Sequence, residues 1–357
     1  MLNEFRQDLV SGEWVLFATG RARRPGAKEK QVPLDQSKDN CPFEDPEKAG
    51  NVVIATYRPR ADVEPAFWHE GTGGLCQRRR GQKAGQFRHR DAWFAKIAKN
   101  KFPAVLEGEV GPRKTVGPFA VTDAKGLHEI VIYRDHDREL HQYSQDELVQ
   151  VFKIYQERYQ AMAGYSSSRY ILIFHNRGAG AGASIAHPHS QIISIPILPP
   201  DVKRSIQGSQ DFYDENSKRV YDLMIDWEVK EKKRIIYENE NFIAFCPFVS
   251  KTPYEVRIFS KESHAHFEQC PPELLPELGN MMSKVLNKIY TALDDPDYNF
   301  FIHTAPVDLK SPPVHEFYSW HIEIVPKMKM EGAFELGSGI EVNVVDPDQA
   351  AEELRNF

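Results

Sequence analysis

The chain has 357 residues, of which 41% are hydrophobic, so it can form one large domain or two of moderate size around an ordinary core. A formal net charge of −6 argues against a nucleic-acid partner, although arginines cluster locally. No apolar run approaches the ~20 residues needed to cross a bilayer, and the four scattered cysteines fit a reducing compartment. We therefore expect a cytoplasmic protein with no membrane partner.

The N-terminal segment predicts a β-hairpin. Two β-rich runs within residues 5–17 are separated by a Ser-Gly turn. Arg21 and Arg24 follow in an Arg-Ala-Arg-Arg-Pro run, for which a solvated basic turn is the ordinary interpretation. Cys41 and Glu44 lie in a short Cys-Pro-Phe-Glu run, and a lone cysteine is most often simply buried.

The middle of the chain alternates loop, strand and helix signals. Residues 70–90 are rich in Gly, Arg and Gln and predict an exposed loop. Asn100 opens an Asn-Lys-Phe-Pro-Ala run, and from the residues alone it could equally be a turn residue. A strand is predicted over residues 126–133, with His136 just beyond it. Ser144, with a glutamate three residues later, forms a capping box ahead of a helix with one apolar face.

Two apolar, strand-like runs are joined by a loop of small residues at 176–184, Asn-Arg-Gly-Ala-Gly-Ala-Gly-Ala-Ser. Such a loop leaves backbone N–H groups open to an anion, although it could also be a hairpin that merely turns. The anion-binding interpretation is favoured by His187, His189 and Gln191. These residues follow at alternate positions and would share one face of the second strand. Polar groups on a buried face need partners, and a phosphate-binding site would supply them.

The loop and the following His187-Pro-His189-Ser-Gln191 motif resemble the active-site signature of the galactose-1-phosphate uridylyltransferase family, the branch of the histidine-triad superfamily whose motif ends in Gln. The resemblance covers nearly the whole chain. It implies an α+β fold of two duplicated histidine-triad-like halves, mostly antiparallel sheet flanked by helices. The halves are expected at residues 1–196, with the signature, and 197–357, with a degenerate copy. Relatives are commonly homodimers, so a homodimer is expected here too.

The resemblance also assigns roles to individual residues. His189 would attack the α-phosphorus of a nucleotide sugar, Gln191 would donate a hydrogen bond to a non-bridging oxygen, and Ser184 would stabilise the leaving phosphate. The residues expected to bind substrate are Arg21, Arg24, Asn100, Asn176, Gly182, Ala183 and Glu341. Glu341 belongs to a C-terminal glycine-rich region that would approach the hexose.

A structural zinc ion is a further implication of the resemblance. Its expected ligands are Cys41, Glu44, His136 and His187. Many relatives carry a second cysteine where this chain has Glu44, and a carboxylate can also ligate zinc. A metal-held His187 would give the nucleophile His189 a rigid neighbour.

The sequence after Arg234 repeats the order of elements that precedes it. Glu129 is matched with Glu255, and the glutamates of the two predicted helix starts are matched at the same offset of 126 (255 − 129). Self-similarity at this scale indicates a duplicated unit of strands and one helix.

The second copy of the signature contains His321 and Glu323. We match His321 with His187 and Glu323 with His189, so a second active copy is not expected. Together with His303 these residues could hold a second metal ion, as in some relatives. No carboxylate matches the remaining ligand, which favours the alternative of satisfied polar residues in a strand.

These features predict an enzyme, a nucleotidyltransferase that uses a nucleotide sugar and a sugar 1-phosphate, as in the conversion of UDP-glucose and galactose 1-phosphate. Two alternatives stay open. In the first, phosphate or water is the acceptor, which would make the protein a phosphorylase or hydrolase, for example one like ADP-glucose phosphorylase. In the second, the protein is catalytically silent and binds nucleotide without forming a covalent nucleotidyl adduct. The sequence determines neither the nucleobase nor the sugar, and galactose specificity does not follow from the resemblance, because Glu335 replaces a lysine typical of the hexose-facing loop.

Overall fold

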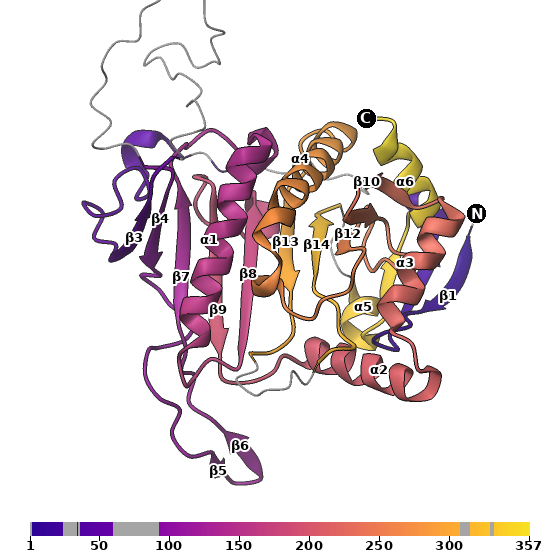
Figure 1. The fold of residues 1–357 in the computed structure, drawn as a ribbon, viewed down its shortest axis with the longest axis horizontal. Helices are drawn as coiled ribbons and strands as arrows, with labels where there is room; N and C mark the ends of the chain where they lie inside the picture. Colours follow the sequence, from indigo (N-terminus) through magenta and orange to yellow (C-terminus); the bar gives the residue numbers. More distant parts are fainter. Residues whose placement is uncertain (1, 24–33, 35, 60–92, 308–314, 329–331) are drawn as a thin grey trace, which may run out of the picture.

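The computed structural model describes residues 2–23, 34, 36–59, 93–307, 315–328 and 332–357 (Figure 1). Within these residues one large antiparallel sheet dominates the fold. In chain order its strands are β3 (Val53–Tyr57), β4 (Ala95–Lys99), β7 (His128–Tyr133), β8 (Tyr170–Arg177), β9 (His189–Ile195), β10 (Ile235–Glu238), β11 (Phe242–Phe245), β12 (Val256–Ser260), β13 (Tyr298–His303) and β14 (His321–Pro326). Across the sheet they lie in the order β10-β11-β12-β14-β13-β8-β9-β7-β4-β3.

Helices and two smaller sheets complete the described structure. The α-helices are α1 (Gln145–Ala163), α2 (Pro200–Asn216), α3 (Val220–Glu231), α4 (Leu275–Ala292), α5 (Ala333–Ser338) and α6 (Pro347–Arg355). The 3-10 helices are η1 (Thr19–Arg23), η2 (Lys38–Asn40), η3 (Leu140–Gln142), η4 (Ala179–Ala181), η5 (Phe267–Gln269) and η6 (Pro272–Leu274). The smaller sheets contain β1 (Asn3–Gln7), β2 (Trp14–Ala18) and β15 (Glu341–Asn343), and a projecting hairpin of β5 (Lys114–Val116) and β6 (Phe119–Val121).

The helices α1 and α4 cover one face of the large sheet side by side (Figure 1). The predicted capping box begins α1: the Ser144 hydroxyl accepts the Glu147 N–H, and the Glu147 carboxylate accepts the Ser144 N–H. Beyond it, Leu148, Phe152 and other apolar residues of one helix face are buried with residues of α4 and of the sheet in the largest hydrophobic core. Burial of this face, more than helix propensity, stabilises α1.

The sheet is built from two copies of one unit. From the two edges inward, the strands run β3, β4, β7, β9, β8 and β10, β11, β12, β14, β13. In chain order, α1 follows β7 and α4 follows β12, each before the strand that reaches the centre of the sheet. The predicted duplicated α+β fold is therefore confirmed. The division at residue 196 stays a prediction.

Strand pairing fixes how the two copies correspond. Ile132 lies opposite His189 in the β7–β9 pair, and Phe259 lies opposite His321 in the β12–β14 pair. Both histidines are the first residues of their strands. The offset between β7 and β12 is therefore 127 (259 − 132), one residue more than predicted.

Hydrogen bonds support the same correspondence. The ring atom Nδ1 of His189 lies 2.9 Å from the carbonyl oxygen two residues earlier, and that of His321 lies 3.1 Å from the equivalent oxygen. His321 thus occupies the place of His189, and Glu323 that of Gln191. The predicted match of His321 to His187 is wrong by two residues. Since side chains two residues apart share a face of a strand, the polar pattern alone does not reveal such a shift.

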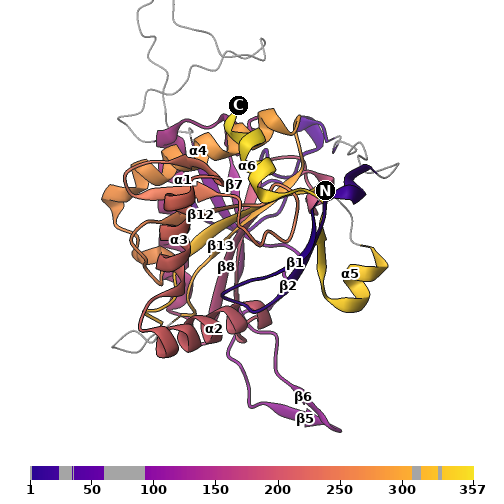
Figure 2. The same cartoon turned by 90° about the vertical axis from the view of Figure 1, so that its right-hand side faces the viewer.

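The N-terminal hairpin forms as predicted, but its partner lies at the other end of the chain. Strands β1 and β2 pair antiparallel, and β2 pairs in parallel with β15 (Figure 2). The Arg6 side chain donates to the Phe248 carbonyl oxygen at 2.9 Å and lies over the Phe248 ring. The hairpin, assigned by sequence to the first half, therefore lies against the second half.

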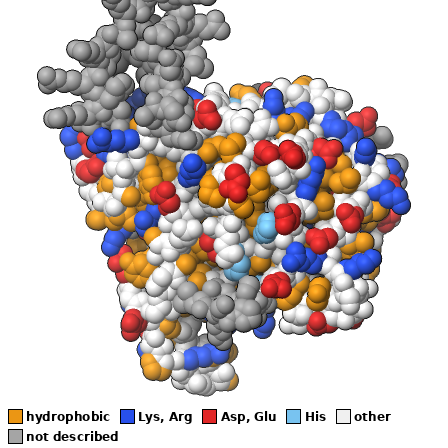
Figure 3. Space-filling model, in the orientation of Figure 1, with side chains coloured by type: hydrophobic (Ala, Val, Ile, Leu, Met, Phe, Trp, Pro, Cys, Tyr) orange, Lys and Arg blue, Asp and Glu red, His pale blue; other side chains and the backbone are white. Residues whose placement is uncertain are grey.

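The face that carries α1 and α4 shows acidic and basic side chains interspersed rather than one broad region of a single sign (Figure 3). Among the helices that the structure describes, none combines the length and the apolar content of a membrane span.

Candidate active site

A cavity of about 340 Å³ lies on the face of the sheet opposite α1. Four of the predicted residues line it together: Asn100, Ser184, His189 and Gln191. They come from the end of β4, from the loop before β9 and from β9 itself. The sequence motif therefore converges on one concave surface, which is the expected form of a ligand site.

His189 is held in one orientation. Its Nδ1 lies 2.9 Å from the carbonyl oxygen of His187, and because a carbonyl only accepts, the ring proton is on Nδ1. The other nitrogen, Nε2, then carries the lone pair. The residue is 6% exposed, the Phe43 ring meets it edge-on at 5.1 Å, and burial lowers the pKa of the imidazole. A neutral imidazole with a free Nε2 can act as a nucleophile at neutral pH.

Gln191 has a histidine partner that the sequence analysis did not single out. Its Oε1 lies 2.9 Å from Nε2 of His128, at the start of β7. Asn100 reaches the same ring, with Nδ2 3.2 Å from Nε2. A sequence signal for His128 did exist. Residues two apart in a strand share a face, so His128 lies on the same face of β7 as Ile130, which lines the cavity.

Other cavity residues were also missed. Phe43, Asn51, Lys101 and Phe102 line the same space. Phe102 is 84% exposed although it is a large aromatic residue. Their role depends on the folding of residues 42–51 against β4, which no local sequence pattern specifies.

Beside the cavity, four predicted metal ligands come together. Nδ1 of His136 and Nδ1 of His187 are 3.2 Å apart, and Sγ of Cys41 lies 3.6 Å from Nδ1 of His187. Glu44 Oε1 is 3.1 Å from the His136 nitrogen and 3.7 Å from the His187 nitrogen. A tetrahedral zinc ion with bonds of about 2.0 Å to nitrogen or oxygen and about 2.3 Å to sulfur would separate its ligand atoms by about 3.3 to 3.6 Å.

The protonation of the two rings agrees with a cation at this centre. Nε2 of His187 donates to the Tyr133 carbonyl oxygen at 2.6 Å, and Nε2 of His136 donates to the Gln36 carbonyl oxygen at 3.0 Å. When the rings carry only these protons, their two Nδ1 atoms direct lone pairs at each other. Such lone pairs repel unless a positive ion lies between them. The donor set therefore fits a metal ion.

Burial also acts on the metal-site residues. It raises the pKa of the Cys41 thiol and lowers the pKa of His187 to about 4. The imidazole is thus already in the neutral form that binds metal, whereas the thiol needs a nearby cation to ionise.

The glycine loop before β9 is held by the second half of the chain. The Asp297 carboxylate accepts the Gly180 N–H at 2.6 Å. Asn299 donates from Nδ2 to Asn176 Oδ1 and to the Ala181 carbonyl oxygen, both at 2.8 Å. Gly178 has φ +81°, and a Cβ there would lie 1.7 Å from Asp297 Oδ1. Only glycine fits this close approach.

The remaining predicted residues lie elsewhere. Among the described residues predicted to bind substrate, only Asn100 lines the cavity. Arg21 is exposed in η1, and Arg24 lies outside the described residues. Gly182 and Ala183 shape the loop, where Gly182 has φ +84°. Glu341 lines a different pocket.

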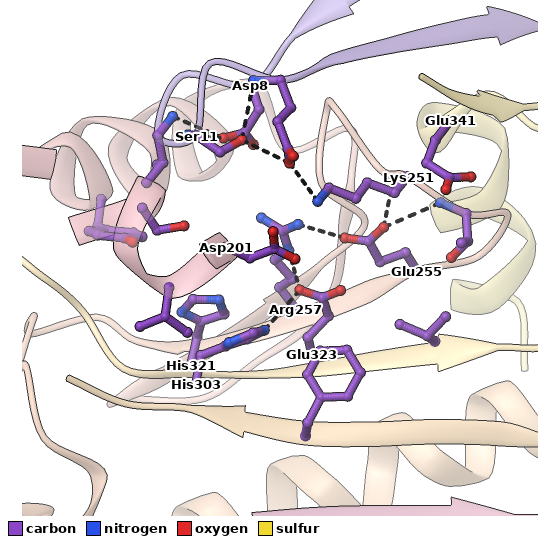
Figure 4. Close-up of a pocket in the computed structure, with 18 of the residues that line it drawn as sticks. Asp8, Ser11, Asp201, Lys251, Glu255, Arg257, His303, His321, Glu323 and Glu341 are labelled. Carbon is purple, nitrogen blue, oxygen red and sulfur yellow. Dashed lines mark hydrogen bonds and ion pairs between the residues drawn. The ribbon is translucent and has the colours of Figure 1, made fainter. Parts of the chain in front are cut away.

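That second pocket, of about 290 Å³, occupies the equivalent position in the second half (Figure 4). It contains His303, His321 and Glu323, whose ligand atoms lie close enough to hold an ion. However, the Arg257 guanidinium, whose side chain is only 11% exposed, already contacts Glu323 at 3.3 Å and Glu255 at 2.8 Å. Its charge holds the pKa of Glu323 well below the usual range. A divalent ion would be placed beside this cation, so the residues do not fit a second metal.

Comparison with known proteins gives matches along the whole chain. Residues 78–199 match the family described as galactose-1-phosphate uridyl transferase, N-terminal domain. An ADP-glucose phosphorylase of Arabidopsis thaliana is 28% identical over 367 residues, covering 99% of this chain and 92% of the relative. A galactose-1-phosphate uridylyltransferase of Thermotoga maritima is 29% identical over 265 residues, covering 72% of this chain and 82% of the relative.

A solved structure resembles the fold over its full length. It is an ADP-glucose phosphorylase from Arabidopsis thaliana with bound ADP-glucose, which superposes with a TM-score of 0.77 at 26% identity. The match covers 100% of this chain and 99% of that structure.

Proposed function

Because the chain belongs to the galactose-1-phosphate uridylyltransferase family, we propose that it transfers the nucleotidyl group of a nucleoside diphosphate hexose to a phosphate acceptor through His189. The observation that carries the proposal is the neutral His189 ring, whose Nδ1 is anchored and whose Nε2 is free beside the cavity. Among acceptors we place inorganic phosphate first. The full-length similarity to an ADP-glucose phosphorylase supports this choice, which would make the enzyme a phosphorylase.

The reaction has two displacements at the α-phosphorus. In the first, His189 Nε2 forms a bond to phosphorus, the bond to the bridging oxygen breaks, and the hexose 1-phosphate leaves. Positive charge develops on the ring and is stabilised by the carbonyl oxygen that accepts its Nδ1–H. In the second, an oxygen of phosphate attacks, the P–N bond breaks, and a nucleoside diphosphate leaves while His189 becomes neutral again.

Two neighbours would stabilise these steps. Gln191 would donate from its amide nitrogen to a non-bridging oxygen, where charge increases in the transition state. The Ser184 hydroxyl would donate to the departing phosphate. Asn100 would bind the ribose or phosphate of the donor at the rim of the cavity.

Zinc is the metal we propose for the site of Cys41, Glu44, His136 and His187, where its role would be to cross-link the chain. His187 would pass this rigidity on to His189 through a direct hydrogen bond. The backbone carbonyl oxygen of His187 accepts the His189 Nδ1–H, so fixing His187 fixes the direction of the nucleophile.

A hexose 1-phosphate acceptor remains the second candidate, supported by the similarity to the uridylyltransferase of Thermotoga maritima. The two candidates are separated by incubating the protein with ADP-glucose or UDP-glucose and either phosphate or galactose 1-phosphate. Release of glucose 1-phosphate and a nucleoside diphosphate with phosphate supports the phosphorylase. Formation of a new nucleotide sugar only with galactose 1-phosphate supports the transferase. Release of glucose 1-phosphate when both acceptors are omitted indicates a hydrolase, because water is then the acceptor.

We further propose, by family resemblance, a homodimer in the cytoplasm. Light scattering of the purified full chain measures the oligomeric state directly, and we expect a mass near twice 41.0 kDa.

A further inference from the structure

We propose that His128 is a positioning residue, which fixes the orientation of the Gln191 side-chain amide so that its nitrogen, and not its oxygen, meets the phosphate. The inference rests on the proposed function of Gln191 as a hydrogen-bond donor. It adds a residue from β7 to a site that the sequence motif places in β9 and the loop before it.

The contacts of the His128 ring determine where its proton lies. The backbone N–H of Ala104 points at Nδ1 at 3.2 Å. A backbone N–H can only donate, so Nδ1 accepts and the neutral ring carries its proton on Nε2. Burial lowers the pKa of His128, which keeps the ring neutral at physiological pH.

The same proton fixes the amide of Gln191. With Nε2 protonated, the atom 2.9 Å away has to be an acceptor, which is Oε1. A flipped amide would leave the Nε2 proton without an acceptor, because the nearby Nδ2 of Asn100 is a donor as well. Asn100 does not compete for this proton, because its Nδ2 is itself a donor and its Oδ1 accepts the Phe102 N–H at 2.9 Å.

The consequence for the cavity is a donor of fixed direction. Because Oε1 of Gln191 is engaged by His128, the NH₂ group is the end available to a ligand. An amide free to rotate would present its oxygen to an anionic phosphate part of the time, and that orientation is repulsive. Preorganised donors stabilise a transition state because no reorientation is needed during the reaction.

The second half of the chain shows the same two positions changed together. At the offset of 127 between β7 and β12 the counterpart of His128 is Glu255, and at the offset of 132 (321 − 189) between β9 and β14 the counterpart of Gln191 is Glu323. There, two carboxylates replace the histidine and the amide, and the Arg257 guanidinium bridges them at 2.8 and 3.3 Å. The two side chains thus contact each other directly in the first half and through Arg257 in the second, and at these two positions only the first half carries neutral side chains.

The test compares His128→Leu with wild type in rapid-quench measurements of nucleotidyl-enzyme formation from ADP-glucose or UDP-glucose. We expect a rate about 10- to 100-fold lower, less than the 10²–10³ that removing a direct donor costs, with KM changed less than about twofold. In a Gln191→Ala background the same substitution should change the rate less than about twofold, because His128 acts only through Gln191. His141→Leu, a buried histidine in η3 stacked on Tyr290, is the control for loss of packing and should leave the rate unchanged.

A purely structural role predicts a different pattern. If His128→Leu lowers the rate equally with and without Gln191, or leaves it unchanged while Gln191→Ala lowers it, the positioning role is overturned and the proposed function stands. A second measurement does not depend on turnover: ¹⁵N NMR of histidine-labelled protein, with His128→Asn to assign the signal. A proton on Nε2 supports the inference, and a proton on Nδ1 overturns it even if no donor is turned over. Wild-type protein that forms no adduct with either donor contradicts the proposed function separately.

Discussion

At the scale of single residues, the direction of one imidazole depends on a hydrogen bond to a residue of the proposed metal site. The carbonyl oxygen of His187 orients His189, and the ring of His187 meets Cys41, Glu44 and His136 at distances that suit a tetrahedral ion. Glu44 is the proposed ligand that most needs a test, because it is a carboxylate at 3.1 Å from His136 and 3.7 Å from His187. A carboxylate is a harder and less strongly bound zinc ligand than a thiolate.

Substitution of Glu44 tests this arrangement. Glu44→Ala should lower zinc affinity by at least about tenfold, and Glu44→Cys should raise it, because a second thiolate replaces a carboxylate. Competition with a chromogenic chelator measures both. Equal affinity in all three proteins would mean that Glu44 is not a ligand.

Sequence reasoning found the residues of this site in large part. Cys41, Glu44, His136 and His187 lie together, as the resemblance implied, although they come from separate parts of the chain. His128 was missed because its role depends on which ring nitrogen faces Gln191, and a sequence does not specify tautomers.

At the scale of elements, the loop before β9 connects the two halves. Its backbone is held by Asp297, which directly precedes β13, and by Asn299, the second residue of that strand. The loop was predicted from its glycines and alanines, but its partners were not. They are more than a hundred residues away, and pairing at that distance leaves no local pattern.

Glycine substitutions separate the two demands on this loop. Gly178→Ala should cost about 1–3 kcal/mol, since it combines a positive φ with a clash against Asp297. Gly182→Ala should cost less, because its φ is positive but a Cβ there meets no described atom within 4 Å. Gly337→Ala, in helix α5 and equally open, should be neutral or stabilising by up to about 1 kcal/mol.

Denaturant unfolding provides the free energies for this series. The predicted order of stability is Gly337→Ala, then Gly182→Ala, then Gly178→Ala. Equal stability of the two loop variants would show that Asp297 does not hold the loop closely.

Strand register was the part of the fold that sequence reasoning placed wrongly. The repeat was visible from element order, but His321 was matched with His187 instead of His189. A shift of two residues preserves the alternation of faces, so hydrophobic periodicity supports both matches equally. Only pairing with β12 distinguishes them.

At the scale of the whole molecule, buried neutral histidines link stability to pH. Burial lowers the pKa of His175 to about 3, whereas an unfolded histidine titrates near ~6.5. Below pH ~6.5 the unfolded chain therefore binds a proton that the folded chain does not, so this residue lowers stability progressively as the pH falls toward 3. Burial raises the pKa of Glu139 to about 7, an effect of opposite sign.

The contribution of His175 is the difference between wild type and His175→Gln in how the free energy of unfolding depends on pH, because groups such as Glu139 contribute equally to both proteins. Between pH 6 and 4 the free energy of unfolding of wild type should fall more steeply, by up to about 1.4 kcal/mol per pH unit. Urea unfolding at several pH values measures the two slopes. Parallel slopes would show that His175 is not a buried neutral group in the folded protein.

The pairing of β2 with β15 is also a property of the whole chain. The hairpin signal at the N-terminus was clear, but a parallel pairing between opposite ends of the sequence follows from tertiary packing. The antiparallel strands and helices of the two halves, by contrast, were expected from the family resemblance and from the repeated order of elements.

The most direct test of the account is mass spectrometry of enzyme quenched during turnover with ADP-glucose or UDP-glucose. We expect a peptide containing residues 187–191 that is heavier by one nucleotidyl group, with the modification on His189. This adduct should be absent from His189→Ala and depleted when phosphate is added. Turnover of either donor with no such adduct, or with the adduct on another residue, would contradict the account.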